Sequence, residues 1–411
     1  MKPLCVCSFC GASEFTADVL LAGTGAYICG TCVTSAAQSI ADAELARYGG
    51  STTDPTALAA HVDRWVIGQE RTKRVLSVAV HNHYKRINKA AHNLQKSNVL
   101  LIGPTGCGKT LLARSLAEAL QVPFVVADVT GLTQAGYAGE DVDSVAEMLF
   151  RAADGDVALA ARGIVVLDEI DKLARRSVGL TRGSLDVSGE AVQQSLLKMV
   201  EGTQVRVGVT PQGRSHEMST ADVLFIASGA FSDLAEITRD RVRRSPLGFG
   251  SPLVVADEGV DPEFEDLVEF GMLPEFLGRF PVVSRLAALD VPQLRRVLLD
   301  VEHALVPEYR TLFALDGIDL RFTDAAIDRI ATQAATLGTG ARALRRILED
   351  LLTDAMFHAT RLPRGTSLTV TGADVEAGRV GQLDDLLGDR ADPQKAAEEA
   401  MRARFRRRAS G

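Results

Sequence analysis

The residues with the clearest chemical meaning are Gly103 to Thr110, which read GPTGCGKT. In this pattern the glycines let successive backbone N–H groups face phosphate oxygens, where side chains would obstruct them. Lys109 reaches the β- and γ-phosphates of a nucleotide, and the Thr110 hydroxyl is a ligand for Mg²⁺. The apolar run at 99–102 predicts a strand before this loop, and TLLARSLAEAL predicts a helix after it. We therefore predict a phosphate-binding loop that binds ATP or GTP.

A second run, IVVLDEID at Ile164 to Asp171, supplies carboxylates. Its four apolar residues predict a buried strand, which in P-loop folds ends beside the phosphate loop. There Asp168 would hold the Mg²⁺ shell and Glu169 would orient the attacking water, so that the bound nucleotide can be hydrolysed. The alternative is a buried strand that ends in a solvated acidic turn, and the presence of GPTGCGKT disfavours it.

The cysteines are concentrated at the N-terminus, where five of the six lie within the first 32 residues. Cys7 and Cys10 form one C-x-x-C pair, and Cys29 and Cys32 form another. Four thiolates at this spacing close a tetrahedral Zn²⁺ site with no open position for a substrate. We predict a structural zinc module, in which Cys5 is either a bystander or exchanges with Cys7 as a ligand.

Length and composition exclude several classes of protein. The chain has 411 residues, a length that suggests two or three domains. Its formal net charge of −8 is unlike the positive net charge that is typical of a protein that binds nucleic acid. No apolar run approaches the roughly 20 residues that cross a bilayer. The N-terminus MKPLCVCSFC has no apolar core of a secretory signal. We expect a cytoplasmic protein without a membrane or nucleic-acid partner.

Short β-rich runs alternate with helical stretches over much of the chain, which predicts an α/β fold with a parallel sheet covered by helices. The predicted strands are 99–102, 124–128, 164–168 and 223–228, and helical periodicity recurs at 292–305 and 341–359. The predicted domains are a zinc-binding domain at 1–48, a linker at 49–60, a large P-loop domain at 61–286, a small domain at 287–380 and a polar, basic tail at 381–411.

Several motifs in one order resemble the ClpX family of AAA+ ring ATPases, from about residue 7 to residue 370. They are CSFC and YICGTC, VIGQE, NHYKR, GPTGCGKT, GYAGED, IVVLDEIDK, DVSGE, LPEFLGR and TGARALR. The resemblance implies an AAA+ P-loop large domain, a smaller C-terminal α/β domain and a treble-clef-like zinc module. VLFIASGAF is closer to the related unfoldase HslU, but HslU has no zinc site and carries an insertion before its acidic strand.

The resemblance also implies roles for individual residues. Arg279 is similar to the arginine finger that reaches the γ-phosphate bound by a neighbouring subunit, and Arg342 to the sensor arginine that couples the small domain to its own nucleotide. A guanidinium suits both roles because it stays charged and its fork matches a phosphate. The expected nucleotide contacts are Val66, Ile67, Gly68 and Gln69 at the adenine, and Pro104, Thr105, Gly106, Cys107, Gly108, Lys109, Thr110 and Leu111 in the loop.

Two further loops match segments that in the family touch proteins. GYAGED places Tyr137 and Ala138 in a loop that lines the central pore of the ring and grips a polypeptide, although the family usually carries Val where Ala138 stands. Leu247, Gly248 and Phe249 match a peptidase-docking tripeptide that normally begins with Ile. The alternative for this tripeptide is packing on its own domain.

The resemblance implies an ATPase that unfolds proteins. It would form a homohexamer, use ATP, Mg²⁺ and Zn²⁺, and pass unfolded or tagged substrates to a ClpP-type peptidase ring, with adaptors possible on the zinc module. The chain itself has no H-E-x-x-H and no nucleophile motif, so we expect no peptidase activity. The alternatives are a non-degradative remodeller of protein complexes and a DNA ATPase of the helicase-loader type, which the acidic balance disfavours.

Overall fold

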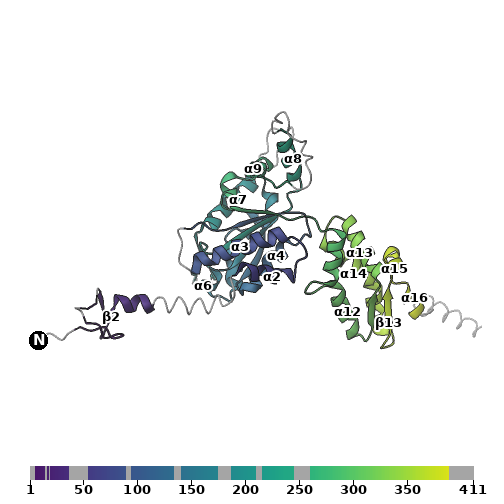
Figure 1. Ribbon diagram of the computed structural model, residues 1–411, viewed down its shortest axis with the longest axis horizontal. Helices are drawn as coiled ribbons and strands as arrows, with labels where there is room; N and C mark the ends of the chain where they lie inside the picture. The colour runs from purple at the N-terminus through teal and green to yellow at the C-terminus, as the bar shows by residue number, and fades with distance from the viewer. Residues whose placement is uncertain are drawn as a thin grey trace, which may run out of the picture.

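A computed structural model describes residues 5–13, 16–17, 19–36, 54–88, 94–133, 140–174, 187–209, 215–244 and 260–387. The chain forms an N-terminal module with an antiparallel hairpin, β1 (Leu20–Gly23) and β2 (Ala26–Cys29), then a large α/β domain and a smaller one (Figure 1). Over the described residues, no helix has the length and apolar character needed to span a membrane. The order of helices and strands confirms the α/β fold class, with its large and small domains and its N-terminal module.

A parallel five-stranded sheet forms the centre of the large domain. Its strands are β3 (Val99–Ile102), β4 (Phe124–Asp128), β7 (Ile164–Asp168), β10 (Leu224–Gly229) and β11 (Val282–Arg285), in the order β11-β3-β10-β7-β4. The four predicted strands are confirmed, and β11 is an additional edge strand. Because all five run in one direction, their carboxyl ends share one edge of the sheet, where ligands bind in open α/β folds.

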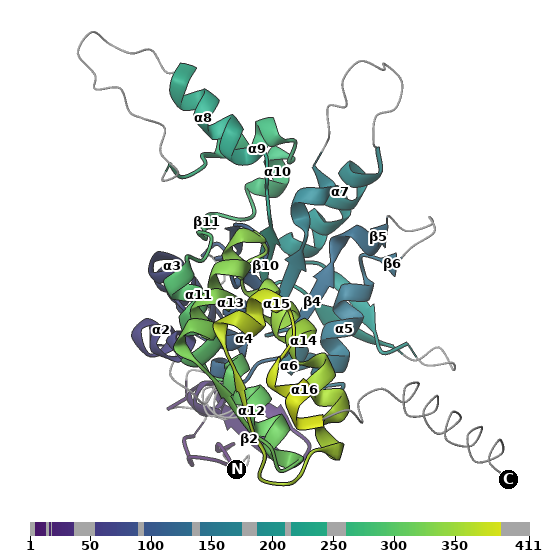
Figure 2. The same ribbon diagram turned by 90° about the vertical axis from the view of Figure 1, so that its right-hand side faces the viewer.

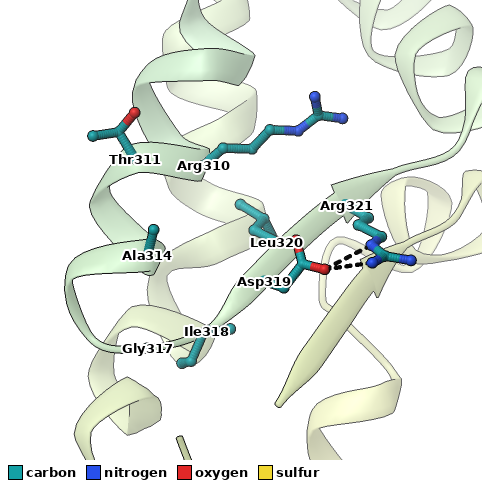
Figure 3. A pocket seen from close by; sticks show the side chains of 8 residues that line it. All are labelled: Arg310, Thr311, Ala314, Gly317, Ile318, Asp319, Leu320 and Arg321. Atoms are coloured by element: carbon teal, nitrogen blue, oxygen red, sulfur yellow. Dashed lines mark hydrogen bonds and ion pairs between the residues drawn. The ribbon is translucent and has the colours of Figure 1, made fainter. Parts of the chain in front are cut away.

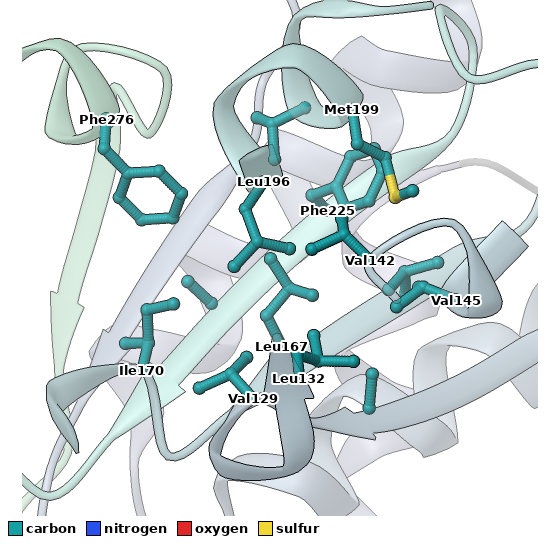
Figure 4. Packing of buried hydrophobic residues seen from close by; sticks show 14 of the residues in the cluster. Val129, Leu132, Val142, Val145, Leu167, Ile170, Leu196, Met199, Phe225 and Phe276 are labelled. Carbon is teal, nitrogen blue, oxygen red and sulfur yellow. The ribbon is translucent and has the colours of Figure 1, made fainter. Parts of the chain in front are cut away.

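Each face of the sheet carries its own hydrophobic core, because successive strand residues point to opposite sides. On one face, Leu101 packs with residues of α2 (Pro55–Asp63), α3 (Glu70–Asn88) and α4 (Lys109–Leu120). On the other face, Leu167 and Phe225 pack with residues of α5 (Ser144–Ala152), α7 (Val187–Glu201), α9 (Phe264–Phe270) and α10 (Pro274–Leu277), as Figure 4 shows in part. The strands are thus covered on both sides.

The remaining elements of the large domain are short. They are η1 (Val129–Gly131), β5 (Leu132–Thr133), β6 (Glu140–Asp141), α6 (Val157–Ala160), η2 (Ile170–Leu173), β8 (Gln204–Val207), β9 (His216–Ser219) and α8 (Leu234–Arg244). Helices α8 and α9 lie at one end of the domain (Figure 2). Asp266 on α9 accepts hydrogen bonds from Arg241 Nε at 2.7 Å and Thr238 Oγ1 at 3.1 Å. Burial alone would raise the pKa of Asp266, but its hydrogen bonds, led by that from Arg241, lower it overall, so the carboxylate stays charged and fastens α9 to α8.

The small domain has one core of its own. Its elements are α11 (Val291–Leu299), α12 (Leu305–Leu315), β12 (Asp319–Phe322), α13 (Asp324–Thr336), α14 (Ala341–His358), η3 (Ala359–Arg361), β13 (Ser367–Val370), α15 (Gly372–Ala377) and α16 (Gln382–Leu387), with β12 and β13 parallel. The helix predicted at 341–359 is confirmed as α14. The periodic stretch 292–305 is helical as far as Leu299, the end of α11, and the chain then turns, with His303 at a left-handed φ of 61°.

Both ends of the two-domain unit differ from the domain limits expected from the sequence. Helix α2 begins at Pro55, inside the stretch 49–60 that was expected to be a linker. Asp54 accepts a hydrogen bond from the Ala57 amide at 3.1 Å, so Asp54-Pro55 is a helix start rather than flexible chain. At the other end, Leu383 of α16 is buried in the small-domain core, within the stretch expected to be a polar tail.

Candidate functional site

The loop between β3 and α4 has the geometry of a phosphate cradle. Gly106 and Gly108 have φ of 77° and 101°, in the left-handed region that favours glycine, and α4 begins at Lys109. Lys109 Nζ donates hydrogen bonds to the carbonyls of Gly103 at 2.6 Å and Pro104 at 3.0 Å, which holds the ammonium over the loop. The N-terminus of α4 points at the same place, and its dipole favours an anion there.

This loop lies on one side of a cleft of about 630 Å³ between the large and small domains. The small domain approaches closely, since the Ala341 amide at the start of α14 donates a hydrogen bond to the Gly106 carbonyl at 3.1 Å. The lining residues from the loop and its helix are Thr105, Gly106, Gly108, Lys109, Thr110 and Leu111. Pro104 and Cys107, also expected as nucleotide contacts, do not line the cleft. Cys107 is buried, which raises the pKa of its thiol and keeps it unreactive.

Asp168 lies at the carboxyl end of β7, beside the phosphate loop. Its Oδ1 accepts hydrogen bonds from Ser228 Oγ at 2.6 Å and from the Glu169 amide at 3.0 Å. Its Oδ2 lies 3.4 Å from Thr110 Oγ1. A carboxylate and a hydroxyl are the hard oxygen donors that Mg²⁺ takes, so this pair fits the predicted metal role.

Ser228 is a site residue that the sequence analysis missed. It belongs to β10, which lies between β3 and β7, and its side chain is fully buried. A polar residue at the end of the predicted strand VLFIAS was the available signal, but the strand order that brings it to Asp168 is a property of the tertiary structure.

Glu169 follows Asp168 and faces the cleft. Its φ of 59° is in the left-handed region, an uncommon conformation for a residue with a long side chain. The next carboxylate, Asp171, accepts hydrogen bonds from the amides of Ala230 and Phe231, both at 3.3 Å. The ends of β7 and β10 are therefore joined twice, once through Asp168 and once through Asp171.

The residues of the segment Val66 to Gln69, which was expected beside the adenine, lie in two environments. Its first two residues are buried, and Gln69 bonds Ala287, where the small domain was expected to begin. Val66 and Ile67 are 5 % and 4 % exposed, and neither lines the cleft. The Gln69 side chain exchanges two hydrogen bonds with the backbone of Ala287, at 2.8 and 3.1 Å. Trp65, the residue directly before this segment, is among the residues that line the cleft. A contact of Val66–Gln69 with adenine stays a prediction.

The two predicted arginines lie in different places. Arg342, on the first turn of α14, lines the cleft together with Lys109 and Glu169. Arg279 follows α10, does not line the cleft, and pairs with Glu201 of α7, with Nε 2.8 Å from Oε1. The cleft of one chain thus contains Arg342 and lacks Arg279.

The N-terminal module brings together the sulfur atoms of Cys7, Cys10, Cys29 and Cys32, all within 4.8 Å of one another. Tetrahedral zinc–sulfur bonds of about 2.3 Å place sulfurs about 3.8 Å apart, so the cluster fits a Zn²⁺ ion. The backbone amide of Cys10 stabilises the Cys7 thiolate and lowers the pKa of Cys7 to about 6, which suits a metal ligand. Cys5 is outside this cluster, which favours its role as a bystander.

Comparison with known proteins agrees with this geometry. Residues 94–283 match the AAA domain (Cdc48 subfamily), residues 6–42 match the ClpX C4-type zinc finger, and residues 294–363 match the C-terminal, D2-small domain of ClpB protein. The chain is 45 % identical over 377 residues, covering 86 % of each protein, to the ATP-dependent Clp protease ATP-binding subunit ClpX of Borrelia duttonii (strain Ly). The same identity and coverage hold for that of Borrelia recurrentis (strain A1).

The chain belongs to the ClpX family. Membership confirms the resemblance drawn from the motifs and the expectation of an AAA+ ATPase with an ATP site and a zinc module. The expected pore residues Tyr137 and Ala138, and the expected docking residues Leu247, Gly248 and Phe249, lie outside the described residues.

A second hollow, of about 730 Å³, lies on the small domain of this ClpX-family chain, against α12 and β12 (Figure 3). Its charged groups include Asp319 and Arg321, which pair with each other through Oδ2 and Nε at 2.8 Å. It has neither a phosphate loop nor convergent carboxylates. The interdomain cleft is therefore the candidate site of this family member.

We expect Ser228→Ala to raise the Mg²⁺ concentration needed for half-maximal ATP hydrolysis about ten- to hundredfold, as loss of a partner behind a metal ligand usually does. The reason is that Asp168 would lose the hydroxyl that orients its Oδ1. The measurement is a Mg²⁺ titration of hydrolysis, paired with Mn²⁺ binding in the presence of ADP. Ser284→Ala, at a buried serine of β11 that bonds Thr72, is the matched control. An unchanged Mg²⁺ requirement in Ser228→Ala would contradict the orienting role.

Proposed function

We propose that this chain is an ATP-dependent protein unfoldase that works as a homohexameric ring and delivers substrates to a ClpP-type peptidase. The observation that carries the proposal is the composition of the cleft. Lys109 and Glu169 of the large domain and Arg342 of the small domain line the same cavity. A nucleotide bound there contacts both domains, so binding and hydrolysis change how the domains are held together.

The side chains divide the work of hydrolysis. Lys109 and the loop amides bind the phosphates, and Arg342 binds them from the small domain. Thr110 and Asp168 would hold Mg²⁺, which neutralises the charge that develops on the phosphates. Glu169 orients the attacking water.

The position of Arg279 supports a ring. Its guanidinium is half exposed and lies outside the cleft of its own chain, so it is available to a neighbouring copy. The relatives from the two Borrelia species are named ATP-binding subunits of the Clp protease, and this supports a ClpP-type partner. Substrate passage through the ring then follows from the predicted role of Tyr137.

The test is ATP-dependent loss of fluorescence from a tagged folded fluorescent protein, with and without a ClpP-type peptidase. We expect unfolding in both cases and degradation only with the peptidase. Glu169→Gln should bind ATP yet fail to unfold the substrate, because it removes the carboxylate that orients water and leaves the phosphate loop intact. Unfolding that persists in Glu169→Gln would contradict the role of this residue, and a wild-type hexamer that unfolds nothing would contradict the function. Unfolding without any transfer to the peptidase would leave the non-degradative remodeller as the function.

A further inference from the structure

Helix α7 contacts two segments that carry residues of the proposed hydrolysis site. One is the segment from Glu169 to Leu173, which begins at the cleft and continues as η2. The other runs from Leu273 through α10 to Arg279, which lies outside the cleft of its own chain. A helix that touches both segments connects the nucleotide that a chain binds to the arginine that it offers to a neighbour.

The side chain of Gln193 makes both contacts. It is fully buried in α7, where its Nε2 group donates a hydrogen bond to the Leu173 carbonyl at 2.8 Å. Its Oε1 atom accepts a hydrogen bond from the Leu273 amide at 3.0 Å. An uncharged amide side chain can donate to a carbonyl and accept from an N–H at the same time. Both backbone groups are costly to leave unpaired away from water, so Gln193 holds the two segments together.

The packing around this side chain is close on both sides. A Cβ atom added to Gly189, one turn earlier in α7, would lie 2.8 Å from the Leu173 carbonyl, so the helix approaches η2 more closely than a larger residue permits. Ile170 of η2, Leu196 of α7 and Phe276 of α10 belong to one hydrophobic cluster (Figure 4). Because close-packed interiors transmit displacements, a movement of η2 is passed on to α7 and α10.

The same helix also holds the far end of the second segment. Glu201, the last residue of α7, pairs with the Arg279 guanidinium, with Nε 2.8 Å from Oε1. The end of α7 is fixed in turn, because the Lys96 ammonium donates hydrogen bonds to the carbonyls of Val200 and Thr220, both at 3.0 Å. Helix α7 thus contacts the segment that carries the arginine at both its beginning and its end.

We propose that Gln193 couples the two nucleotide sites that one chain serves, so that a nucleotide held at Glu169 improves the position in which the chain presents Arg279 to its neighbour. The inference rests on the proposed function, in which Arg279 acts on the nucleotide of an adjacent copy. A bound nucleotide restrains the residues beside it, and the hydrogen bonds of Gln193 carry this restraint from Leu173 to Leu273 and so to the start of α10. Gln193 does not line the cleft, so it is a positioning residue.

Mixed rings test the coupling. The acceptor chain is Arg279→Ala, which has a working phosphate loop and needs an arginine from its neighbour. Two donors supply Arg279 and hydrolyse nothing themselves, namely Lys109→Ala, whose own site is empty, and Glu169→Gln, whose own site holds ATP. Equal mixtures with either donor contain the same share of complete interfaces. We expect hydrolysis to be at least about fivefold faster with the filled donor, the lower end of typical coupling between two sites.

The same comparison is then made with Gln193→Met in both donors. Methionine keeps the length of the side chain and removes both hydrogen bonds, so the rates with the filled and the empty donor should become equal. Gln193→Asn, whose amide is one methylene too short to reach both partners, should have the same effect and is the second variant if the first fails to assemble. The matched control is Gln194→Ala, at the exposed glutamine next along α7, which should leave the difference between the donors intact.

Calorimetric ATP binding to each Glu169→Gln donor, and sedimentation of each mixture, show that the variants fold and assemble. Equal rates with the two donors that keep Gln193, or a slower rate with the filled one, would overturn the proposal. A difference that persists in Gln193→Met or Gln193→Asn would overturn it as well. Failure of every mixture to hydrolyse ATP, with Gln193 intact, is a distinct result, which overturns the action of Arg279 on a neighbour and with it the proposed function.

Discussion

Replacing Arg279 by alanine should lower ATP hydrolysis by about 10³-fold or more while leaving ATP binding unchanged, as loss of an arginine supplied to a γ-phosphate usually does. The reason is positional. Arg279 is outside the cleft of its own chain and pairs with Glu201 at the surface, so it has no part in binding the nucleotide of that chain. Steady-state hydrolysis and calorimetric ATP binding measure the two effects separately. Arg346→Ala, at an exposed arginine of α14 that pairs with Asp350, is the control for loss of a surface charge.

A mixing experiment shows whether the site is shared between two chains. Lys109→Ala lacks a working phosphate loop but keeps Arg279, whereas Arg279→Ala keeps the loop. Each variant alone should be inactive. In rings assembled from equal amounts of both, about a quarter of the interfaces join an intact loop to an intact arginine, so hydrolysis should return in part. If Arg279 acts within its own chain, mixing restores nothing, and a site completed by the neighbour is ruled out.

Removal of zinc should unfold the N-terminal module. Zinc sites of this kind supply roughly 10–16 kcal/mol of folding free energy, more than a short segment gains from its apolar surface. Several apolar side chains of the module are exposed, among them Phe9 at 71 % and Val19 and Leu21 at 52 % each, so little of its stability comes from burial. We expect a chelator, or Cys29→Ser, to abolish zinc binding and make this module sensitive to proteases.

The control for the zinc prediction is Cys5→Ser, which removes a thiol outside the cluster. It should keep one zinc ion per chain by metal analysis. The large domain should stay folded in all these variants, because its core is formed by other residues, and ATP binding by the isolated chain should persist. Loss of zinc from Cys5→Ser, or a Cys29→Ser protein that retains zinc, would show that the ligand set is wrong.

The strands of the central sheet show which elements a local sequence pattern can predict. The runs at 99–102, 124–128 and 164–168 are apolar and short, and each is a strand at the predicted place. Strand β11 gave no such signal, because it is a four-residue edge strand with its Val283 side chain partly exposed. Its place in the sheet comes from pairing with β3, which a local pattern does not reveal.

The break between α11 and α12 shows the opposite case, where the periodic pattern extends beyond the helix. The residues 292–305 have helical periodicity, yet the chain turns after Leu299 and resumes as a helix at Leu305. The turn is held by contacts with the large domain, the Arg64–Glu302 ion pair and the Trp65–His303 rings. Contacts between distant segments thus override the helical preference, and they place Trp65 and His303 beside the cleft.

The phosphate loop, the acidic strand and the two C-x-x-C pairs were readable from the residues alone, because each carries its geometry within a few consecutive positions. The placement of Ser228 against Asp168 and of Trp65 in the cleft was not. These depend on strand order and on how two domains pack, and both are set by burial of side chains that lie far apart along the chain. A motif of a few consecutive residues can therefore be recognised in the sequence, whereas the residues that contact it from other segments are determined by the tertiary structure.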